Sequence, residues 1–310
     1  MVPASEWTTA LSQEVTASIV LYNHSVQDVA PLFEQFARET ALSEWVVVDN
    51  GGAEDACAVA ESLGARCLHP GRNLGFGAAH NLALRSLSAA VGPYHLILNP
   101  DIRMPDGTLA ELATVMGAMP QVGLLMPRVL YPDGSTQYLC KLLPTPLDLV
   151  LRRFAGAPLR SLFYKRMTRY DMKQFNYSQP AYVPILSGCF MLIRRSVLES
   201  IGGFDERFFL YMEDTDLCRR VGDMARLLFW PRTTVIHSHA QGSYKSLMLL
   251  LLHLRAAIVY FNKWGWWGDP VREARNLVGL TEANIDPVRL KLVPQEGGGS
   301  DIPAWPSNDK

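Results

Sequence analysis

Short apolar runs alternate with amphipathic segments through the first part of the chain. The runs are rich in β-branched and aliphatic residues and predict strands at residues 16–22, 44–49, 65–69 and 94–98. The intervening segments repeat apolar residues at helical spacing and predict helices at residues 26–40, 53–63, 77–89 and 106–118. Strands that alternate with helices predict an α/β fold built on a mainly parallel sheet.

The second half of the chain is less regular. Its pattern predicts strands at residues 123–131, 186–193 and 226–230, and helices at residues 213–221 and 246–262. Residues 291–310 are rich in Gly, Pro and Ser and predict a flexible tail. With no internal repeat and no clear linker, the pattern predicts one domain over residues 1–240 and a helical extension over residues 241–290.

Composition and charge narrow the class of protein. The 310 residues are 48% hydrophobic, which is enough apolar material for a sizeable core. The 29 Lys and Arg against 30 Asp and Glu leave a net charge of −1, which argues against a nucleic-acid-binding protein. The five cysteines are odd in number and widely spaced, so we expect neither a disulfide framework nor a cysteine-rich zinc site. A reducing cytosol fits this usage best.

Membrane targeting is not obvious from the sequence. The N-terminus lacks the basic and apolar regions of a signal peptide. The most apolar stretch, residues 247–261, is interrupted by His253 and Arg255, whereas a spanning helix needs about 20 apolar residues. We therefore expect no membrane-spanning helix.

Polar residues follow three of the predicted strands directly. They are Tyr22 and Asn23, Asp49 and Asn50, and the tripeptide 99–101. In a parallel α/β sheet, ligands bind outside the carboxyl ends of the strands. These residues therefore predict a common binding crevice.

The segment 71–81 is rich in glycine and asparagine. Gly75 and Gly77 allow the backbone to approach a ligand closely, and Asn73 and Asn81 offer donors and acceptors that suit a nucleobase or a ribose. The segment is not a dinucleotide-binding fingerprint, because His80 occupies the third glycine position. The alternative interpretation is an ordinary tight turn into a helix.

Two further segments carry candidate metal ligands. Asn99 and Asp101 supply oxygen ligands of the kind that Mg²⁺ and Mn²⁺ prefer, although an Asn-Pro-Asp sequence is also a common turn. His237 and His239 follow the last predicted strand and point to opposite faces. One of them can reach a metal while the other packs.

Glu213 and Asp214 stand where a helix is predicted to begin. A carboxylate there is stabilised by the helix dipole and can serve as a general base. The alternative is structural, with Asp214 as a helix cap and Asp216 and Arg220 as a surface ion pair.

Taken together, these motifs in this order resemble family 2 glycosyltransferases, and more narrowly their bacterial rhamnosyltransferase branch. The residues that carry the resemblance are 20–23, 48–51, 73–77, 98–101, 186–191, 202–205 and 213–217. The resemblance implies a GT-A fold, with a Rossmann-like, mainly parallel mixed sheet flanked by helices and a C-terminal helical extension. It divides the domain into a nucleotide-binding half, 16–120, and an acceptor half, 121–240. It also implies an inverting reaction with a nucleotide-sugar donor, most often dTDP-L-rhamnose.

The resemblance also assigns roles by position. It implies that the nucleotide sugar is bound by Tyr22, Asn23, Asp49, Asn50, Asn73, Gly75, Gly77, Asn81, Asn99, Ser187 and Gly188. Asp101 and His237, the latter preferred over His239, would bind Mg²⁺ or Mn²⁺. Asp214 would be the catalytic base, with Glu213 beside it. The rival interpretations are a UDP- or GDP-sugar donor, a sugar nucleotidyltransferase and a non-catalytic relative that binds glycans or nucleotides.

Two segments bear on the acceptor. Residues 141–173 alternate basic and apolar blocks, and Trp264, Trp266 and Trp267 are of a type enriched at membrane interfaces. A lipid-linked glycan acceptor, used by a cytoplasmic enzyme peripheral to the inner face of the membrane, would account for both. The alternatives are a solvated helical face over the acceptor cleft and a packed core helix.

Overall fold

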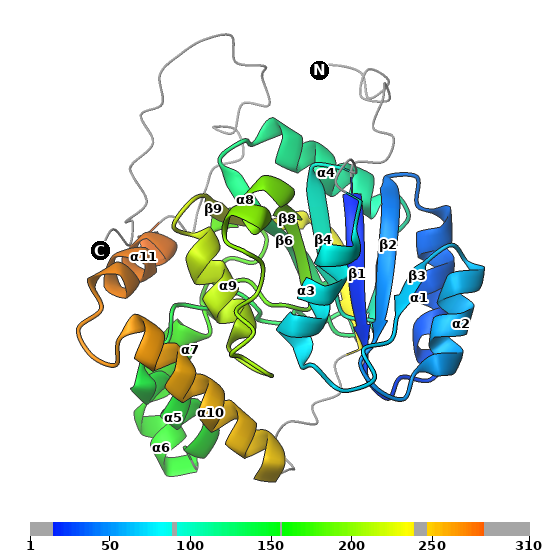
Figure 1. Ribbon diagram of the computed structural model, residues 1–310. Helices are drawn as coiled ribbons and strands as arrows, with labels where there is room; N and C mark the ends of the chain where they lie inside the picture. Colours follow the sequence, from blue (N-terminus) through cyan, green and yellow to red (C-terminus); the bar gives the residue numbers. More distant parts are fainter. Residues whose placement is uncertain (1–14, 89–91, 156, 239–246, 282–310) are drawn as a thin grey trace, which may run out of the picture.

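The computed structural model describes residues 15–88, 92–155, 157–238 and 247–281, and a nine-stranded mixed sheet forms its centre (Figure 1). The strand order is β3-β2-β1-β4-β8-β6-β9-β5, and β7 pairs with β9. The strands are β1 Val15–Leu21, β2 Leu42–Asp49, β3 Arg66–Leu68, β4 Tyr94–Leu98, β5 Ile102–Arg103, β6 Val122–Leu130, β7 Ala181–Tyr182, β8 Phe190–Arg194 and β9 Arg226–His237.

Helices flank the sheet and extend beyond it (Figure 1). They are α1 Val26–Arg38, α2 Glu54–Ser62, α3 Phe76–Ser86, α4 Thr108–Ala118, α5 Pro146–Phe154, α6 Ala157–Leu162, α7 Tyr164–Tyr170, α8 Arg195–Ser200, α9 Glu213–Val221, α10 Leu247–Trp264 and α11 Pro270–Thr281. The alternation predicted for the first half is confirmed, with shifts of a few residues at the ends. Among the predicted elements, the largest shift at an end is in β9, which continues to His237 instead of ending at residue 230. Elements β5, β7, α8 and α11 had no predicted counterpart of their own.

The sheet positions the polar strand ends at one edge. Strands β3, β2, β1 and β4 are mutually parallel, and Leu21 lies opposite Asp49 in the register of β1 and β2. Strand β8 runs antiparallel between β4 and β6, which makes the sheet mixed. Since β1 and β4 are buried along their whole length, their side chains form the centre of the core.

A buried polar network joins α3 to the sheet. The Ser18 hydroxyl lies 2.7 Å from His80 Nδ1 and 2.8 Å from His95 Nε2, and all three side chains are buried. Burial lowers the pKa of each of the two histidines to about 3, so both are neutral at physiological pH. His80, at the third glycine position of the 71–81 segment, is thus a packing residue.

The C-terminal helices are tied to α9 by buried ion pairs. Arg219 binds Asp269 through two hydrogen bonds of 2.6 and 2.9 Å and stacks on Trp264. Asp216 is fully buried and contacts Arg220, Lys263 and the indole N–H of Trp264 at 2.7–2.8 Å. The expected ion pair of Asp216 and Arg220 is present, but it is buried rather than at the surface, because Lys263 and Trp264 of α10 pack on Asp216. These contacts anchor the helix that carries Asp214.

Helix α10 is only partly buried, with one face exposed. Only Ala256, Tyr260 and Phe261 are buried among its residues, so the interpretation as a packed core helix is wrong. Among the described residues it is the one helix whose length and composition would allow it to cross a membrane, with 18 residues and a mean hydropathy of 1.2. That finding concerns length and composition alone, so the expectation that no helix spans a membrane stays a prediction. The predicted extension is present as α10 and α11, whereas residues 241–246, 282–290 and the predicted tail 291–310 lie outside the described residues.

Candidate active site

Asn50 joins two of the predicted motifs. Its Nδ2 donates to Asn73 Oδ1 at 2.9 Å and to the Gly75 carbonyl at 3.2 Å, while its Oδ1 accepts the Leu74 N–H at 2.7 Å. The end of β2 and the glycine-rich segment therefore meet at one edge of the sheet. The Asn50 side chain is buried, whereas Asn73 is exposed at the rim.

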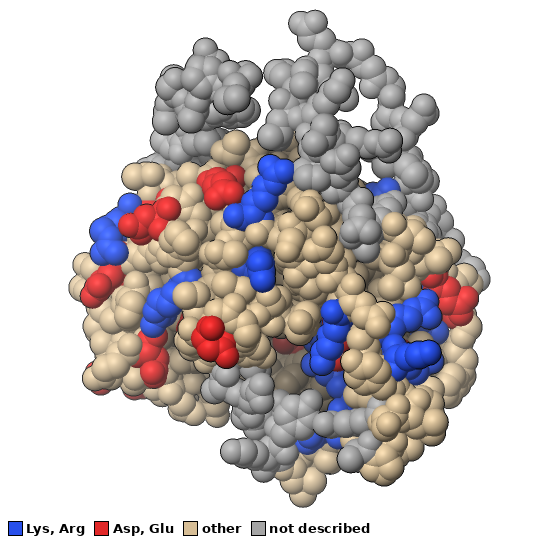
Figure 2. Space-filling model, turned by 180° about the vertical axis from the view of Figure 1, so that it is seen from behind, with Lys and Arg blue, Asp and Glu red and all other residues tan. Residues whose placement is uncertain are grey.

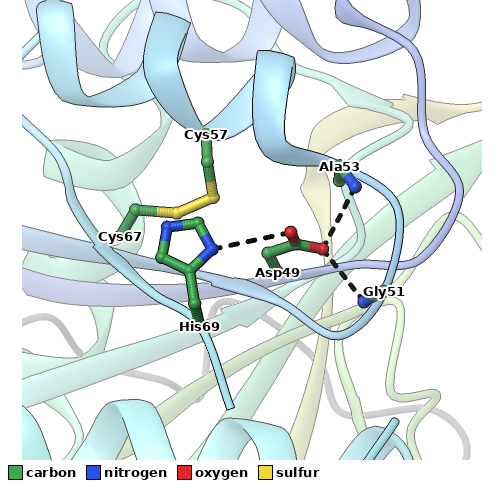
Figure 3. The surroundings of a disulfide bond; sticks show 6 residues. All are labelled: Asp49, Gly51, Ala53, Cys57, Cys67 and His69. Carbon is green, nitrogen blue, oxygen red and sulfur yellow. Dashed lines mark hydrogen bonds and ion pairs between the residues drawn. A yellow bond between two sulfur atoms is a disulfide. The ribbon is translucent and has the colours of Figure 1, made fainter. Parts of the chain in front are cut away.

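Asp49 is held in place by the turn that follows it (Figure 3). Its Oδ1 accepts N–H groups from Gly51 at 2.9 Å and Ala53 at 3.1 Å, and its Oδ2 lies 3.6 Å from His69 Nδ1. His69 is half exposed and had not been singled out in the sequence. One carboxylate oxygen is therefore committed to the turn, and the other faces His69.

A disulfide lies next to this group. Cys57 of α2 and Cys67 of β3 are joined, with Cα atoms 5.9 Å apart (Figure 3). We expected no disulfide framework, and this bond corrects that prediction for the pair. Spacing could not reveal it, because the turn at Gly64 folds β3 back against α2. Among the described residues, Cys140, Cys189 and Cys218 are free and buried.

Tyr22 and Asn23 border the same turn. The Asn23 N–H donates to the Gly51 carbonyl at 2.8 Å, and Asn23 adopts a left-handed backbone with a φ of 55°. The Tyr22 side chain is 52% exposed, so its ring is accessible for stacking by a ligand. Nearby, His24 Nδ1 accepts the Tyr22 N–H at 2.9 Å.

Gly75, Gly77 and Asn81 contact other parts of the protein and do not face an open binding site. The Asn81 amide clamps Phe204, accepting its N–H and donating to its carbonyl, both at 2.8 Å. A Cβ on Gly77 would lie 2.8 Å from that of Phe204, and one on Gly75 would collide with the Phe209 carbonyl. We expected the side-chain amide of Asn81 to face a nucleotide, but its donor and acceptor atoms bond to the backbone of Phe204. These three residues position the loop that leads to Asp214.

Asp101 and His237 meet at the other end of the site. His237 Nε2 lies 3.2 Å from Asp101 Oδ1 and 3.3 Å from Asn99 Nδ2. Partial burial is the largest single influence on Asp101 and raises its pKa, but a charged His237, a backbone hydrogen bond and His24 together lower the pKa of this carboxyl below its usual value. His237 is the last residue of β9 rather than part of a following loop, and His239 lies outside the described residues.

Gln137 orients this histidine. Its Oε1 lies 3.0 Å from His237 Nδ1, and its Nε2 donates to the His237 carbonyl at 2.8 Å. Because an amide oxygen only accepts, Nδ1 carries a hydrogen. In the neutral imidazole the Nε2 lone pair then faces Asp101, whereas in the charged imidazole Nε2–H donates to it. No sequence signal links Gln137 to His237, since they are 100 positions apart.

The pair fits a divalent cation. Two acceptor atoms 3.2 Å apart repel each other unless a proton or a metal ion lies between them. Adjacent ligands of an octahedral Mg²⁺ lie about 3 Å apart, and carboxylate oxygen and imidazole nitrogen both suit Mn²⁺. Anchoring of the second imidazole nitrogen, as by Gln137, is usual for histidines that bind metals.

Asp214 stands in the first turn of α9. Its Oδ2 accepts the Gly188 N–H at 3.2 Å and its Oδ1 accepts the Thr215 N–H at 2.7 Å. Tyr211 and Met212, just before the helix, both have positive φ values, 70° and 66°. Such strain in residues other than glycine is concentrated at functional sites. Met212, not Asp214, is the N-cap, so the structural alternative of a capping role is wrong.

Glu213 differs from its neighbour. It is buried, and its Oε2 has no hydrogen-bond partner among the described residues. Burial, with the charge of Asp214 beside it, raises the pKa of Glu213 to about 8. Glu213 is therefore protonated at neutral pH, and Asp214 is the carboxylate available as a base.

The raised pKa predicts a pH dependence of stability. The unfolded chain releases the Glu213 proton near pH 4.5, whereas the folded protein keeps it up to about pH 8, so stability falls as pH rises across this interval. The slope is at most about 1.4 kcal/mol per pH unit. Since glutamine does not titrate, Glu213→Gln should lack this loss in urea unfolding at pH values from about 5 to 8. Parallel pH profiles for the two proteins would contradict the assignment.

One cavity of about 840 Å³ collects part of the site. Its lining includes the predicted residues Asn99, Ser187, Gly188, Glu213, Asp214 and His237. Tyr22, Asp49, Asn50 and Asn73 lie outside this lining, along the neighbouring strand ends. The cavity is also lined by residues that had not been assigned roles, among them Tyr138, Lys141, Arg152 and His253. The arrangement places a candidate base, Asp214, and a candidate metal ligand, His237, in one cavity.

Comparison with sequence families identifies the family of this chain. The sequence model described as Glycosyl transferase family 2 matches residues 17–202, which include every predicted nucleotide-sugar residue. The chain belongs to glycosyl transferase family 2. The resemblance deduced from the motifs is thus confirmed.

Curated relatives of this glycosyltransferase narrow the branch. An N-acetylglucosaminyl-diphospho-decaprenol L-rhamnosyltransferase of Mycobacterium tuberculosis is 30% identical over 266 residues, covering 78% of this chain and 84% of the relative. Rhamnosyltransferase WbbL of Escherichia coli K12 is 26% identical over 229 residues, covering 71% and 82%. The glycosyltransferase therefore lies among relatives of the rhamnosyltransferase branch.

Solved structures support the fold. The mannosyltransferase PcManGT from Pyrobaculum calidifontis, in complex with GDP-Man and Mn²⁺, superposes with a TM-score of 0.53 and 17% identity. The superposition covers 90% of this chain and 78% of that one. The predicted GT-A fold, a mixed and mainly parallel sheet flanked by helices with a C-terminal helical part, is confirmed.

Proposed function

We propose that this glycosyltransferase moves L-rhamnose from dTDP-L-rhamnose onto a hydroxyl of a lipid-linked glycan precursor, with inversion at the anomeric carbon. The observation that carries the proposal is the cavity shared by Asp214 and His237, with Asp101 3.2 Å from His237. Its curated relatives supply the sugar, since two of them are rhamnosyltransferases. The relative from M. tuberculosis has a lipid diphosphate in its name.

The donor extends along the strand ends. Tyr22, Asn23, Asp49, Asn50 and Asn73 contact the nucleotide, and Asn99, Ser187 and Gly188 contact the diphospho-sugar. In this proposal residues 16–120 form the nucleotide-binding half and residues 121–240 the acceptor half. Gly75, Gly77 and Asn81 act indirectly, by positioning the loop before Asp214.

Asp214 removes the proton from the acceptor hydroxyl as the oxygen attacks the anomeric carbon. The N–H groups of Gly188 and Thr215 fix its orientation, and the start of α9 stabilises its charge. A neutral Glu213 avoids a second negative charge beside the base. A single displacement of this kind inverts the anomeric configuration, because acceptor and leaving group occupy opposite sides.

Asp101 and His237 would hold Mg²⁺ or Mn²⁺ for the donor. A divalent ion bound there supplies charge neutralisation for the departing diphosphate. Gln137 keeps the His237 Nε2 lone pair directed at that place. The residues thus divide the work: Asp214 acts on the acceptor, and Asp101 and His237 act on the donor side.

The place of action follows from the acceptor. A lipid-linked precursor lies in a membrane, so the enzyme works as a cytoplasmic protein peripheral to the inner face of the cell membrane. The exposed α10 and the basic 141–173 segment are the surfaces for that contact.

A panel of nucleotide sugars tests the donor. A ligand that binds only the folded protein raises its melting temperature. We expect the largest rise with dTDP-rhamnose, compared with dTDP-glucose, UDP-glucose and GDP-mannose, and we expect Mn²⁺ to increase it. NAD serves as the negative control. A larger rise with another sugar nucleotide would replace the rhamnosyl assignment, and no rise with any of them would favour a non-catalytic relative.

A further inference from the structure

Basic side chains line the part of the cavity next to α5 and α10. They are Lys141, Arg152, Arg153, Lys173 and His253. The acidic side chains in the same lining are Asp171, Asp214 and Glu213, and Glu213 is protonated at neutral pH. The four Lys and Arg residues therefore outnumber Asp171 and Asp214, and this part of the cavity has an excess of basic side chains although the chain as a whole is nearly neutral.

These cations are close enough to disturb one another. Burial lowers the pKa of Lys141 to about 8, and Arg152 pushes it in the same direction, whereas Asp214 and Asp171 oppose the change. Burial likewise lowers the pKa of His253, with Arg152, Arg153 and Lys141 adding to the effect. The ion pair of Arg152 and Asp171, 3.7 Å apart, offsets one of these charges, and the remaining like charges repel one another less when an anion enters. The group is suited to an anion with more than one charge.

The same helices carry an apolar surface. On α10, Leu249 and His253 line the cavity, while Leu247, Leu251, Leu254 and Ile258 form a stripe at helical spacing that is 39–73% exposed. On α5, Leu149, Arg152 and Arg153 line the cavity, while Leu147, Val150 and Phe154 are 42–54% exposed.

The two stripes lie near each other, because α5 packs against α10, and Figure 1 shows both in one group of helices beside the sheet. In Figure 2, blue basic side chains gather near the lower right of the face, next to tan ones. Exposed apolar stripes that lie together are typical of surfaces that bind a partner or a membrane. Here it borders a cationic cavity.

We propose that Lys141, Arg152 and Arg153 bind the diphosphate of a lipid-diphosphate acceptor, whose hydrocarbon chain leaves the cavity over the apolar stripes of α5 and α10. The inference rests on the proposed function and adds a subsite to it. Guanidinium groups bind diphosphates directly through paired hydrogen bonds. Asp101 and His237, in contrast, bind a diphosphate only through a metal ion, and in the proposed function that diphosphate belongs to the sugar donor. The basic side chains and the candidate metal site would thus bind one diphosphate each, that of the acceptor and that of the donor.

Vesicle binding tests this subsite without any transfer reaction. The probe is phosphatidylcholine vesicles that contain geranylgeranyl diphosphate, and vesicles with geranylgeraniol lack only the diphosphate. We expect the protein to bind the first vesicles at least about tenfold more tightly. The double variant Arg152→Ala/Arg153→Ala should lose that preference, and so should Lys141→Met, which removes one charge with little change in side-chain length. The second variant covers the case that the first does not fold.

Lys165→Ala is the matched control. Lys165 is exposed on α7 in the same basic segment but does not line the cavity, so its removal should leave vesicle binding unchanged. Equal binding of both kinds of vesicle by the unmodified protein would overturn the inference. So would inorganic pyrophosphate binding as tightly as the lipid diphosphate, because the apolar surface would then contribute nothing.

Donor binding separates this inference from the proposed function. The same variants are heated with dTDP-rhamnose and Mn²⁺, and we expect their melting temperatures to rise as much as that of the unmodified protein. A failure of the unmodified protein to respond to any nucleotide sugar would contradict the proposed function alone. Variants that lose the donor response but keep vesicle binding would show that the cations serve the donor, which would overturn the subsite.

Discussion

Asp214→Asn is expected to lower the rate of sugar transfer by about 10²–10⁴-fold, the usual contribution of a general base. The amide is similar in shape, and its oxygen can accept either the Gly188 or the Thr215 N–H but not both, so the cavity should keep its shape at the cost of one hydrogen bond. It cannot remove a proton from the acceptor hydroxyl. Donor binding should persist, and initial rates with saturating donor, together with a donor-induced shift in melting temperature, measure the two effects separately.

Asp216→Asn provides the contrast on the same helix. Asp216 is fully buried between Arg220, Lys263 and Trp264, and breaking such a pair costs about 3–5 kcal/mol of stability. This variant should unfold at lower urea concentration, whereas Asp214→Asn should unfold nearly as the unmodified protein does. Normal turnover by Asp214→Asn would remove Asp214 from the role of base.

Asp101→Ala is expected to abolish the effect of Mn²⁺ on donor binding. Its Oδ1 is the acceptor that faces His237 Nε2 at 3.2 Å, and alanine leaves only the imidazole for the ion. Gln137→Leu should weaken metal binding by a smaller factor, about 10–100-fold, because it frees the imidazole to rotate without removing a ligand. Titration of Mn²⁺ in the presence of the donor measures both variants.

An exposed carboxylate serves as the control for this series. Asp55→Ala, in the first turn of α2, removes the same charge from the surface and should leave the Mn²⁺ response unchanged. If Asp101→Ala retained the full response, Asp101 would be no metal ligand and the donor diphosphate would be held by other groups.

Local patterns were sufficient to predict much of the framework. Strands β1, β2 and β4, which precede Tyr22, Asn50 and Asn99, are short and apolar and were predicted from the sequence. Because they pair in parallel, their carboxyl ends lie at one edge of the sheet. Helix α9 begins at Glu213, as predicted, because the polar and apolar residues there repeat at helical spacing. Ordered motifs identified the family, since each one reflects chemistry that needs particular residue types at fixed spacing.

The roles of several residues depended on distant contacts. Asn81 has the donors and acceptors of a ligand-binding residue, yet Phe204, more than 100 positions away, uses them. The role of Gln137 in orienting His237 is visible only in the folded structure. The pKa of Glu213 is raised because the fold buries its side chain. Burial and hydrogen-bond partners decide whether a polar group is free to act, and neither is a local property of the sequence.

The amino-acid sequence by itself therefore determined the α/β framework, the order of the motifs and the residues able to act as base or metal ligand. Only the tertiary structure decided which of them face the cavity, that Cys57 pairs with Cys67, and that α10 leaves its apolar stripe exposed. The physical reason is the distance along the sequence over which each effect acts. Periodicity and residue chemistry act over a few positions, whereas burial, pKa and pairing are set by segments that meet only when the chain folds.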